Sequence, residues 1–302
     1  MSTPPTGDQH VLVHGEHTAV VTEIGAGLRA YDVSGVPVVD GFAEAERAVG
    51  ARGQVLLPWP NRVGDGAWQW RGERLQLALS EPDRSCAIHG LTRWAPWSLV
   101  DRTAAQVRLG LLLAPQSGWP FVLRCQVDYG LDDAGLQATT TVTNVGNGSS
   151  PVAFGAHPYL SAGGGLVDDC EVRLQAAAVL LTDDRGLPAG VAVVSGDFDL
   201  RRPSRIGSRR LDHAFTDLEA DADGRSRLVL SRPDGSAVQV WSGPGLPWLQ
   251  VFSGDTLPES VRRRGLAVEP TSAPPDALRS GVDLVVLAPG EARSWTWGAG
   301  PA

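Results

Sequence analysis

The stretch GLQATTTVTNVGNG, residues 135–148, decides the fold class of this chain. Its side chains alternate: Leu136, Ala138, Thr140 and Val142 share one face, and polar residues take the other. A period of two is typical of a half-buried strand, whereas a helix has a period of 3.6. The stretch ends in asparagine and glycine, which favour a turn. It therefore predicts a β-strand followed by a turn.

The segments around this stretch have the same character. The preceding residues, VLRCQVDYGLDDAG (122–135), have strand composition, and their link at 132–135 predicts a hairpin. Similar patterns return at residues 170–182, 226–243 and 283–298. In the first of these, LQAAAVLL suits a helix as well as a strand, so both remain open. One short helix is expected, around residues 43–49.

Glycine and proline punctuate the whole chain of 302 residues, with 36 glycines and 22 prolines. This spacing of turn residues between short strands is typical of large antiparallel sandwiches. The sequence contains no low-complexity linker and no repeat. The prediction is an all-β fold, a large antiparallel β-sandwich with few short helices, forming a single domain over residues 1–302.

Composition argues against several classes of function. The net charge of −8 disfavours a nucleic-acid partner, because phosphate binding needs a basic surface. The first twenty residues lack a signal-peptide pattern, and no apolar run approaches the length of a membrane span. Three widely spaced cysteines, Cys86, Cys125 and Cys170, form no disulfide framework. A cytoplasmic protein without a membrane partner is expected.

Glu269 is the first candidate for chemistry. It follows the apolar run 266–268 and precedes Pro270, so a carboxylate lies at the end of a buried-looking strand with a stiff backbone behind it. The simple interpretation is a strand that ends in a turn. The functional interpretation is a catalytic base that is held in one orientation.

Two histidines follow apolar residues in a comparable way. His157 precedes a proline, and Tyr159 shares its face in an extended chain, which makes His157 a candidate general acid. His89 precedes Gly90, which permits a tight turn. A structural histidine at a strand end is the alternative for both.

Arg62 and Asp212 complete the set of polar candidates. Arg62 would project from a loop stiffened by two prolines, and Asn61 can bond its own backbone there. Asp212 is followed by His213, a pair that suggests a catalytic triad or a metal site. No nucleophile elbow supports a triad, and no compact metal motif supports a metal site. The spacing of His89, His157 and His213 in the sequence does not exclude their convergence on a metal.

The motifs taken together resemble the aldose 1-epimerase (galactose mutarotase) family. They follow the family's order from about residue 20 to the end of the chain: PWPNRVGDGAW (58–68), IHGLTRW (88–94), AHPYL (156–160), AAAVLLTDDRGLPAG (176–190), LDHAF (211–215), LQVFSGD (249–255) and AVEPTSAPPDAL (267–278). The family fold, a large β-sandwich of the galactose mutarotase type (a supersandwich), agrees with the strand pattern.

The resemblance implies a role for each candidate in an isomerase that interconverts the anomers of an aldohexose. Glu269 is the general base for the C1 hydroxyl, and His157 is the general acid for the ring oxygen. The resemblance implies that Glu269 is ionised while His157 is protonated. It implies no metal and no organic cofactor, and a small sugar as the partner of a monomer or weak homodimer. The substrate-binding residues would be Arg62, His89, Asp212, Asn61 and Tyr159.

The substrate leaves alternatives. Thr271 stands where the family often has methionine, and Asp276 stands in place of an asparagine, which bears on substrate fit. Some relatives act on phosphorylated or sulfonated hexoses, and the arginines at 262–264 would contact such an anionic group if they faced the site. A non-catalytic carbohydrate-binding protein of the same fold is the rival from another class. A metal-dependent β-sandwich enzyme is a third interpretation.

Overall fold

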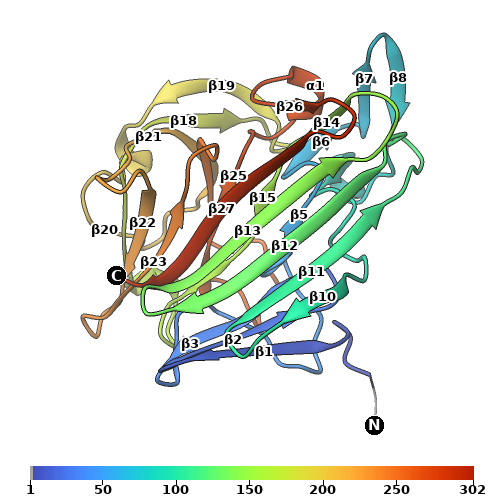
Figure 1. Ribbon diagram of the computed structural model, residues 1–302. Helices are drawn as coiled ribbons and strands as arrows, with labels where there is room; N and C mark the ends of the chain where they lie inside the picture. The colour runs from blue at the N-terminus through green and yellow to red at the C-terminus, as the bar shows by residue number, and fades with distance from the viewer. Residues whose placement is uncertain (1–2) are drawn as a thin grey trace.

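The computed structural model describes residues 3–302, and strands make up most of it (Figure 1). Helix in these residues is limited to one turn of α-helix and three short 3₁₀ turns: α1 (Ala277–Ser280), Pro82–Arg84, Val167–Asp169 and Gly196–Phe198. The prediction of an all-β chain with few short helices is confirmed. None of the helices in residues 3–302 has the length and apolar character that crossing a membrane requires.

The largest sheet has nine strands, and each pairs antiparallel with its neighbours. In spatial order they are β10 (Ser98–Arg102), β11 (Gln106–Leu113), β12 (Leu123–Asp132), β13 (Gly135–Asn144), β27 (Ala292–Pro301), β23 (Ala237–Ser242), β22 (Ser226–Ser231), β17 (Glu171–Leu174) and β20 (Ser204–Arg205).

A second sheet of eight strands faces the first and carries the functional residues described below. Its path is β19 (Pro188–Val193), β18 (Ala176–Thr182), β21 (Asp212–Leu218), β24 (Trp248–Phe252), β25 (Gly265–Thr271), β15 (Gly155–Ala156) and β5 (Val55–Leu56), and β16 (Tyr159–Ser161) also pairs with β25.

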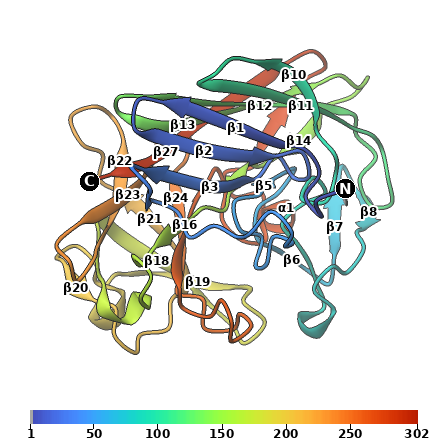
Figure 2. The same ribbon diagram turned by 90° about the horizontal axis from the view of Figure 1, so that it is seen from below.

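Smaller sheets cover the edges. A four-stranded sheet lies against β11 and β12, as the view from below shows (Figure 2). It contains β1 (Gln9–His14), β2 (His17–Thr22), β3 (Leu28–Val33) and β4 (Val36–Pro37). Three two-stranded sheets pair β6 (Arg62–Gly64) with β9 (Cys86–Ile88), β7 (Ala67–Trp70) with β8 (Glu73–Gln76), and β14 (Ser150–Val152) with β26 (Val285–Leu287).

The hairpin predicted at residues 132–135 is confirmed. Asp132 pairs with Gly135, which leaves two residues for the turn between β12 and β13. Gly135 has a φ of +117°, and a Cβ there would lie 2.8 Å from the Ala299 carbonyl oxygen, so glycine suits both the turn and the neighbouring strand. Leu136, Ala138 and Val142 are buried, as the alternation in the sequence indicated.

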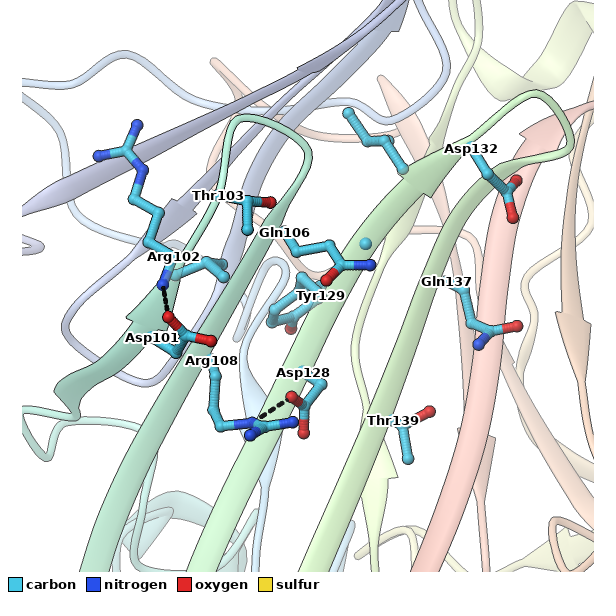
Figure 3. Close-up of a pocket in the computed structure, with 13 residues that line it drawn as sticks. Asp101, Arg102, Thr103, Gln106, Arg108, Asp128, Tyr129, Asp132, Gln137 and Thr139 are labelled. Carbon is cyan, nitrogen blue, oxygen red and sulfur yellow. Dashed lines mark hydrogen bonds and ion pairs between the residues drawn. The ribbon is translucent and has the colours of Figure 1, made fainter.

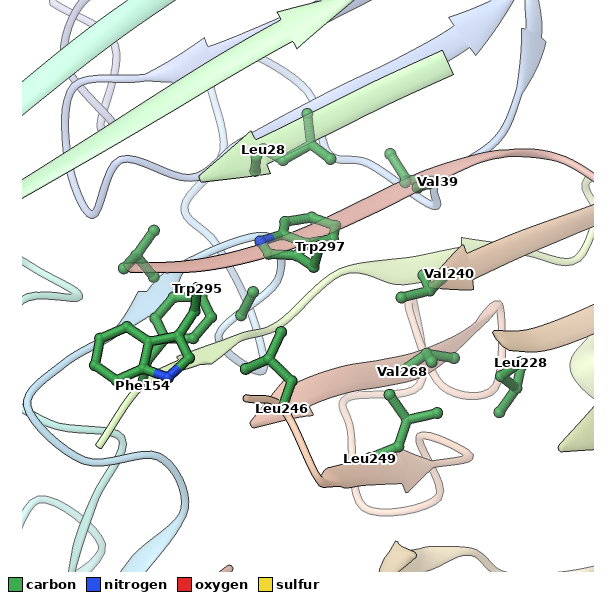
Figure 4. Close-up of a cluster of buried hydrophobic side chains, with 14 of the residues drawn as sticks. Leu28, Val39, Phe154, Leu228, Val240, Leu246, Leu249, Val268, Trp295 and Trp297 are labelled. Atoms are coloured by element: carbon green, nitrogen blue, oxygen red, sulfur yellow. The ribbon is translucent and has the colours of Figure 1, made fainter. Parts of the chain in front are cut away.

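The main core fills the space between the two large sheets (Figure 4). Trp295 and Trp297 of β27 point into it from one side, and Leu249 of β24 and Val268 of β25 line the other. Phe154 stacks on Trp295 with 5.5 Å between ring centroids and 11° between planes. One continuous apolar cluster therefore joins strands from both halves of the chain.

Two local expectations are settled by the structure. Residues 43–49 form turns and irregular backbone, so the helix expected there is wrong. The Glu46 carboxylate accepts a hydrogen bond from the Ala43 N–H, and the Ala43 carbonyl accepts one from the Glu46 N–H. These bonds close a single turn, which is too short to propagate a helix.

LQAAAVLL lies in β17 and β18, because pairing with β22 and β21 outweighs the helix propensity of alanine.

Two leucines in β11 test which face of the nine-stranded sheet is buried. Leu109 is fully buried, whereas Leu112 is 57% exposed. We expect Leu109→Ala to lower the free energy of unfolding by about 2–5 kcal/mol, because it removes buried apolar volume. Leu112→Ala should change it by about 0.5 kcal/mol or less. Urea unfolding of the two variants measures the difference, and equal losses would contradict the assigned faces.

Candidate active site

A cavity of about 270 Å³ lies against the eight-stranded sheet, on the face opposite the core. This size suits one small molecule, since pockets for drug-sized ligands run from about 300 to 1,000 Å³. All seven residues singled out in the sequence line it: Asn61, Arg62, His89, His157, Tyr159, Asp212 and Glu269.

A larger groove of about 420 Å³ runs over β10 to β13 (Figure 3). Its charged side chains are open to solvent, and Arg108 forms an ion pair with Asp128. Among the residues the structure describes, no histidine or cysteine lines this groove. It offers no buried acid–base pair, so the chemistry is sought in the smaller cavity.

Glu269 and His157 form a buried contact in the lining of the cavity. The distance from His157 Nε2 to Glu269 Oε1 is 3.3 Å, and both residues are at most 3% exposed. The expectation that the strand ends at Glu269 is wrong: β25 continues through Pro270 to Thr271, and Glu269 pairs with Gln250 of β24. Neighbouring strands, rather than a turn, hold the carboxylate in place.

One atom of each partner has no hydrogen bond within residues 3–302. These atoms are Glu269 Oε2 and His157 Nδ1, and both are shielded from solvent. Buried polar atoms are nearly always paired, and exceptions are concentrated where function needs them. The unpaired atoms therefore mark Glu269 and His157 as a pair with a functional rather than a structural role.

Burial sets the ionisation of this pair. It raises the pKa of Glu269 well above its usual range, and the nearby Asp212 carboxylate acts in the same direction. Burial, with the positive charges of Arg93 and Arg52, lowers the pKa of His157 to about 3. Both shifts favour neutral groups, with the proton on the carboxyl. These directions are opposite to the charges that the family resemblance implies for the reacting site.

His89 is held as a neutral donor. The backbone N–H of Asn61 donates to the ring Nδ1 of His89 at 3.1 Å. The backbone N–H of His89 donates to the Asn61 carbonyl at 2.9 Å. Because Nδ1 accepts, the proton of the neutral ring must be on Nε2. Burial lowers the pKa of His89 well below its usual value. Gly90, with a φ of +70°, passes so close to Leu57 that a side chain would collide there.

A metal fits this arrangement poorly. His89, His157 and Glu269 each offer one ligand atom, and these atoms lie within 4.8 Å of one another. A metal ligand must present an unprotonated nitrogen, however, and the protonated Nε2 of His89 cannot do so while Nδ1 accepts its bond from Asn61. Only one histidine and one carboxylate remain, which is fewer than the three protein ligands of a typical catalytic zinc site.

Arg62 is oriented by an acid that sequence reasoning missed. Its Nε and Nη2 donate to the two oxygens of Glu81 at 2.7 and 3.0 Å, and its Nη1 lies 4.0 Å from Asp212 Oδ2. Asp212 in turn accepts from the side chain of Gln250 at 2.7 Å. Neither Glu81 nor Gln250 is close in sequence to its partner, so no local pattern could have revealed them.

Asn61 and Tyr159 support their neighbours. Asn61 has a φ of +54°, and its side-chain oxygen accepts the N–H of Arg62 at 2.9 Å. The Tyr159 ring stacks on His157 with 5.1 Å between centroids and 8° between planes. The Tyr159 hydroxyl donates to the Gly50 carbonyl at 2.8 Å, so it is already engaged within the protein.

Several other candidates lie outside the cavity. His213 packs on Phe198, with 4.5 Å between ring centroids, and does not join a cluster with His89 and His157. None of the arginines at 262–264 lines the cavity, so the condition for their contact with a substrate anion is not met. Arg263 instead pairs with Asp168 and Asp255 at 2.7 Å each.

The two departures from the family pattern also lie outside the cavity lining. Thr271 is buried in β25. Asp276 accepts the N–H of Gly64 at 2.9 Å and donates its own N–H to the Arg62 carbonyl at 2.7 Å. It therefore supports the strand that carries Arg62. The expected bearing of Thr271 and Asp276 on substrate fit would have to act indirectly.

The chain is similar to known proteins over nearly its whole length. The family model described as aldose 1-epimerase matches residues 8–298. YihR of Escherichia coli (strain K12) is 33% identical over 288 residues, which cover 95% of this chain and 91% of that protein.

Two solved structures share the fold. A galactose mutarotase-like protein from Clostridium acetobutylicum superposes with a TM-score of 0.85 at 17% identity, covering 97% of this chain and 94% of that one. Galactose 1-epimerase from Lactobacillus acidophilus NCFM has a TM-score of 0.79 at 21% identity, with the same coverage of 97% and 94%. At these identities the comparison establishes a common fold.

The neutral state of His89 has a consequence for stability. Its pKa in the native protein is below its value of about 6.5 in the unfolded chain, so unfolding takes up a proton between those pH values. The contribution is therefore present above pH 6.5 and is lost as the pH falls. We expect the unfolding free energy of the wild type to decrease relative to His89→Gln by up to about 1.4 kcal/mol per pH unit below 6.5. Denaturant unfolding from pH 7.5 to 5 measures this, and a difference that does not change with pH would contradict it.

Proposed function

The chain belongs to the aldose 1-epimerase family, and we propose that it interconverts the α and β anomers of an aldohexose by opening and closing the sugar ring. The observation that carries the proposal is the buried contact of Glu269 with His157, two residues that line a cavity suited to one small molecule. Ring opening needs proton removal and proton delivery on two sides of one bond, and this pair supplies both groups.

The 3.3 Å contact offers a route to the reactive charges. Transfer of the shared proton from the Glu269 carboxyl to the His157 imidazole produces a carboxylate and an imidazolium. Hydrogen bonds from a sugar stabilise these charged forms against the cost of burial. Glu269 then takes the proton of the C1 hydroxyl while His157 protonates the ring oxygen.

The remaining steps return the site to its charged, reactive state, from which the proton can pass back from His157 to Glu269. The bond between C1 and the ring oxygen breaks, which leaves a free aldehyde. Rotation about the bond between C1 and C2 turns the other face of the aldehyde toward the ring oxygen's hydroxyl. His157 takes that hydroxyl proton back as the ring closes, and Glu269 returns its proton to the new C1 hydroxyl. Protons balance over one turnover, and no step draws on a metal or an organic cofactor.

The other cavity residues hold the sugar in this proposal. The Nε2–H of His89 is a fixed donor for the ring oxygen, and Arg62 and Asp212 bind hydroxyl groups. Asn61 and Tyr159 act through their neighbours, by shaping the loop of Arg62 and by stacking on His157. A non-catalytic sugar-binding protein is the weaker candidate, because binding alone has no need for an acid and a base in contact.

Substitution of the pair tests the proposal. We expect Glu269→Gln and His157→Ala each to lower kcat for anomer exchange by about 10²–10⁴-fold, the usual contribution of a positioned acid or base. Polarimetry or exchange NMR on freshly dissolved α-glucose and α-galactose gives the rates. His213→Ala is the matched control, since His213 adjoins Asp212 in sequence but lies outside the cavity, and it should retain activity. Undiminished turnover by Glu269→Gln would refute the mechanism.

Arg93 favours an anionic hexose as a second candidate substrate. Arg93 lines the cavity, and its Nη2 donates to the Ile88 carbonyl at 3.3 Å, whereas its buried Nε has no hydrogen-bond partner within residues 3–302. No carboxylate of residues 3–302 lies within 4.0 Å of it, and burial lowers the pKa of Arg93 to about 10. A buried cation without a paired anion is costly, and a phosphate or sulfonate on the sugar would supply that anion.

Arg93→Gln separates the two substrate classes. If the substrate carries a phosphate or sulfonate, the variant should lose about 10–100-fold in kcat/KM for that sugar, the value of one charge-assisted hydrogen bond. Exchange by neutral glucose should change little. Exchange NMR with glucose, a hexose phosphate and a sulfonated hexose compares them. An equal loss for all three sugars would show that Arg93 does not recognise an anion.

A further inference from the structure

Asp40 and Arg52 form a buried ion pair that the acid–base chemistry does not use directly. The distance from Arg52 Nη2 to Asp40 Oδ2 is 3.1 Å, and the two residues are 2% and 8% exposed. Despite this contact, no hydrogen bond of good geometry within residues 3–302 is made by three buried atoms of the pair: Arg52 Nε, Arg52 Nη2 and Asp40 Oδ2. Such a pair contributes little to stability, because desolvating both charges offsets their attraction. A role other than stability is therefore worth seeking.

The pair is connected to the catalytic histidine through one aromatic ring. The Arg52 guanidinium lies over the Tyr159 ring, 4.3 Å from its centroid. The same ring stacks on His157, with 5.1 Å between centroids and only 8° between planes. Guanidinium, phenol and imidazole thus lie in successive contact, and Arg52 limits the positions that Tyr159 can take behind His157.

Backbone bonds tie the same residues together. The Asp40 N–H donates to the Tyr159 carbonyl at 2.8 Å, and the Gly53 N–H donates to the His157 carbonyl at 2.8 Å. Asp40 and Arg52 therefore lie at the two ends of a loop, residues 41–51, that is anchored to the strand segment of His157. Three residues of this loop, Ala48, Gly50 and Ala51, line the cavity. The ion pair closes the base of the loop.

We propose that Asp40 and Arg52 are positioning residues, which hold Tyr159 against His157, close loop 41–51 beside the cavity and keep a positive charge near the imidazole. This inference rests on the proposed function of His157 as the acid. It adds residues that touch neither the sugar nor the reacting atoms.

The charges around His157 give Arg52 a measurable effect. Arg93 and Arg52 both lower the pKa of His157, with Arg93 the larger of the two. Loss of Arg52 would leave the Asp40 carboxylate with only the more exposed Arg264, whose Nη2 lies 3.6 Å from Asp40 Oδ1, and the loss of one positive charge favours a protonated imidazole. The titratable or charged groups that face His157 from the packed elements are Glu269 of β25, Tyr159 of β16, His89 and Arg93 of the segment after β9, and Arg52 before β5.

The test is a titration of His157 with and without Arg52. The imidazole ¹⁵N shifts of His157 are followed in a Glu269→Gln background, in which residue 269 cannot take up the proton. We expect Arg52→Gln to raise the midpoint for His157 by about one pH unit, the effect of one unit charge at this range. Arg52→Lys keeps the charge and should leave the midpoint in place. Arg227→Gln is the control. Like Arg52, Arg227 forms ion pairs with aspartate, in its case with Asp221 and Asp223, but it lies on β22, outside the cavity.

Kinetics in the otherwise unaltered protein complete the test. Arg52→Gln should lower kcat about tenfold with little change in KM, because a misplaced acid affects the chemical step more than binding. If Arg52→Gln does not fold, Arg52→Lys tests the positioning role. An ammonium group cannot stack as a plane on Tyr159, so kcat should fall several-fold.

The outcomes are distinct. A folded Arg52→Gln protein with an unchanged His157 midpoint would overturn the inference, as would an unchanged kcat in Arg52→Lys. The titration requires no turnover, so a protein that epimerises no sugar would contradict the proposed function without affecting the link between Arg52 and His157.

Discussion

The register between three neighbouring strands is the constraint on which this site depends. Gln250 of β24 lies opposite Glu269 of β25 and opposite Ala214 of β21, two residues from Asp212. These polar side chains therefore share one face, while Val251 and Val268 point into the core on the other. A slip of one residue would exchange the two faces and bury the carboxylate among apolar side chains. Core packing and the geometry of the candidate site are two results of the same pairing.

Hydrogen bonding around the cavity is selective. The groups that orient the site are satisfied within the protein: Arg62 by Glu81, Asp212 by Gln250, and His89 by Asn61. The buried atoms left unpaired in residues 3–302 include one on each of His157, Glu269 and Arg93. Preorganised partners reduce the reorganisation that a reaction would need. Arg52 and Asp40 extend this arrangement one layer further from the cavity.

Sequence reasoning succeeded where the determining interactions are local. The hairpin at 132–135 follows from turn chemistry, and the alternation in 135–148 follows from one buried face. It was insufficient where neighbours in space decide the secondary structure. Residues 43–49 form a single turn beside the cavity instead of the expected helix. The segment of β18, which suited a helix as well as a strand, is a strand because β21 and β19 pair with it. The arginines at 262–264 lie away from the cavity because Arg263 and Arg264 find carboxylate partners elsewhere.

The sequence by itself determined the fold class and indicated the seven polar residues that line the cavity, because strand periodicity, turn residues and local motifs are properties of adjacent positions. Only the tertiary structure decided how those residues meet. It brought Glu81 to Arg62 and Arg52 to Tyr159, and it placed Glu269 inside a strand with its carboxylate 3.3 Å from His157. It also set their ionisation, since burial favours the neutral forms of both groups. Desolvation and long-range pairing depend on the complete packed chain, and no short segment encodes them.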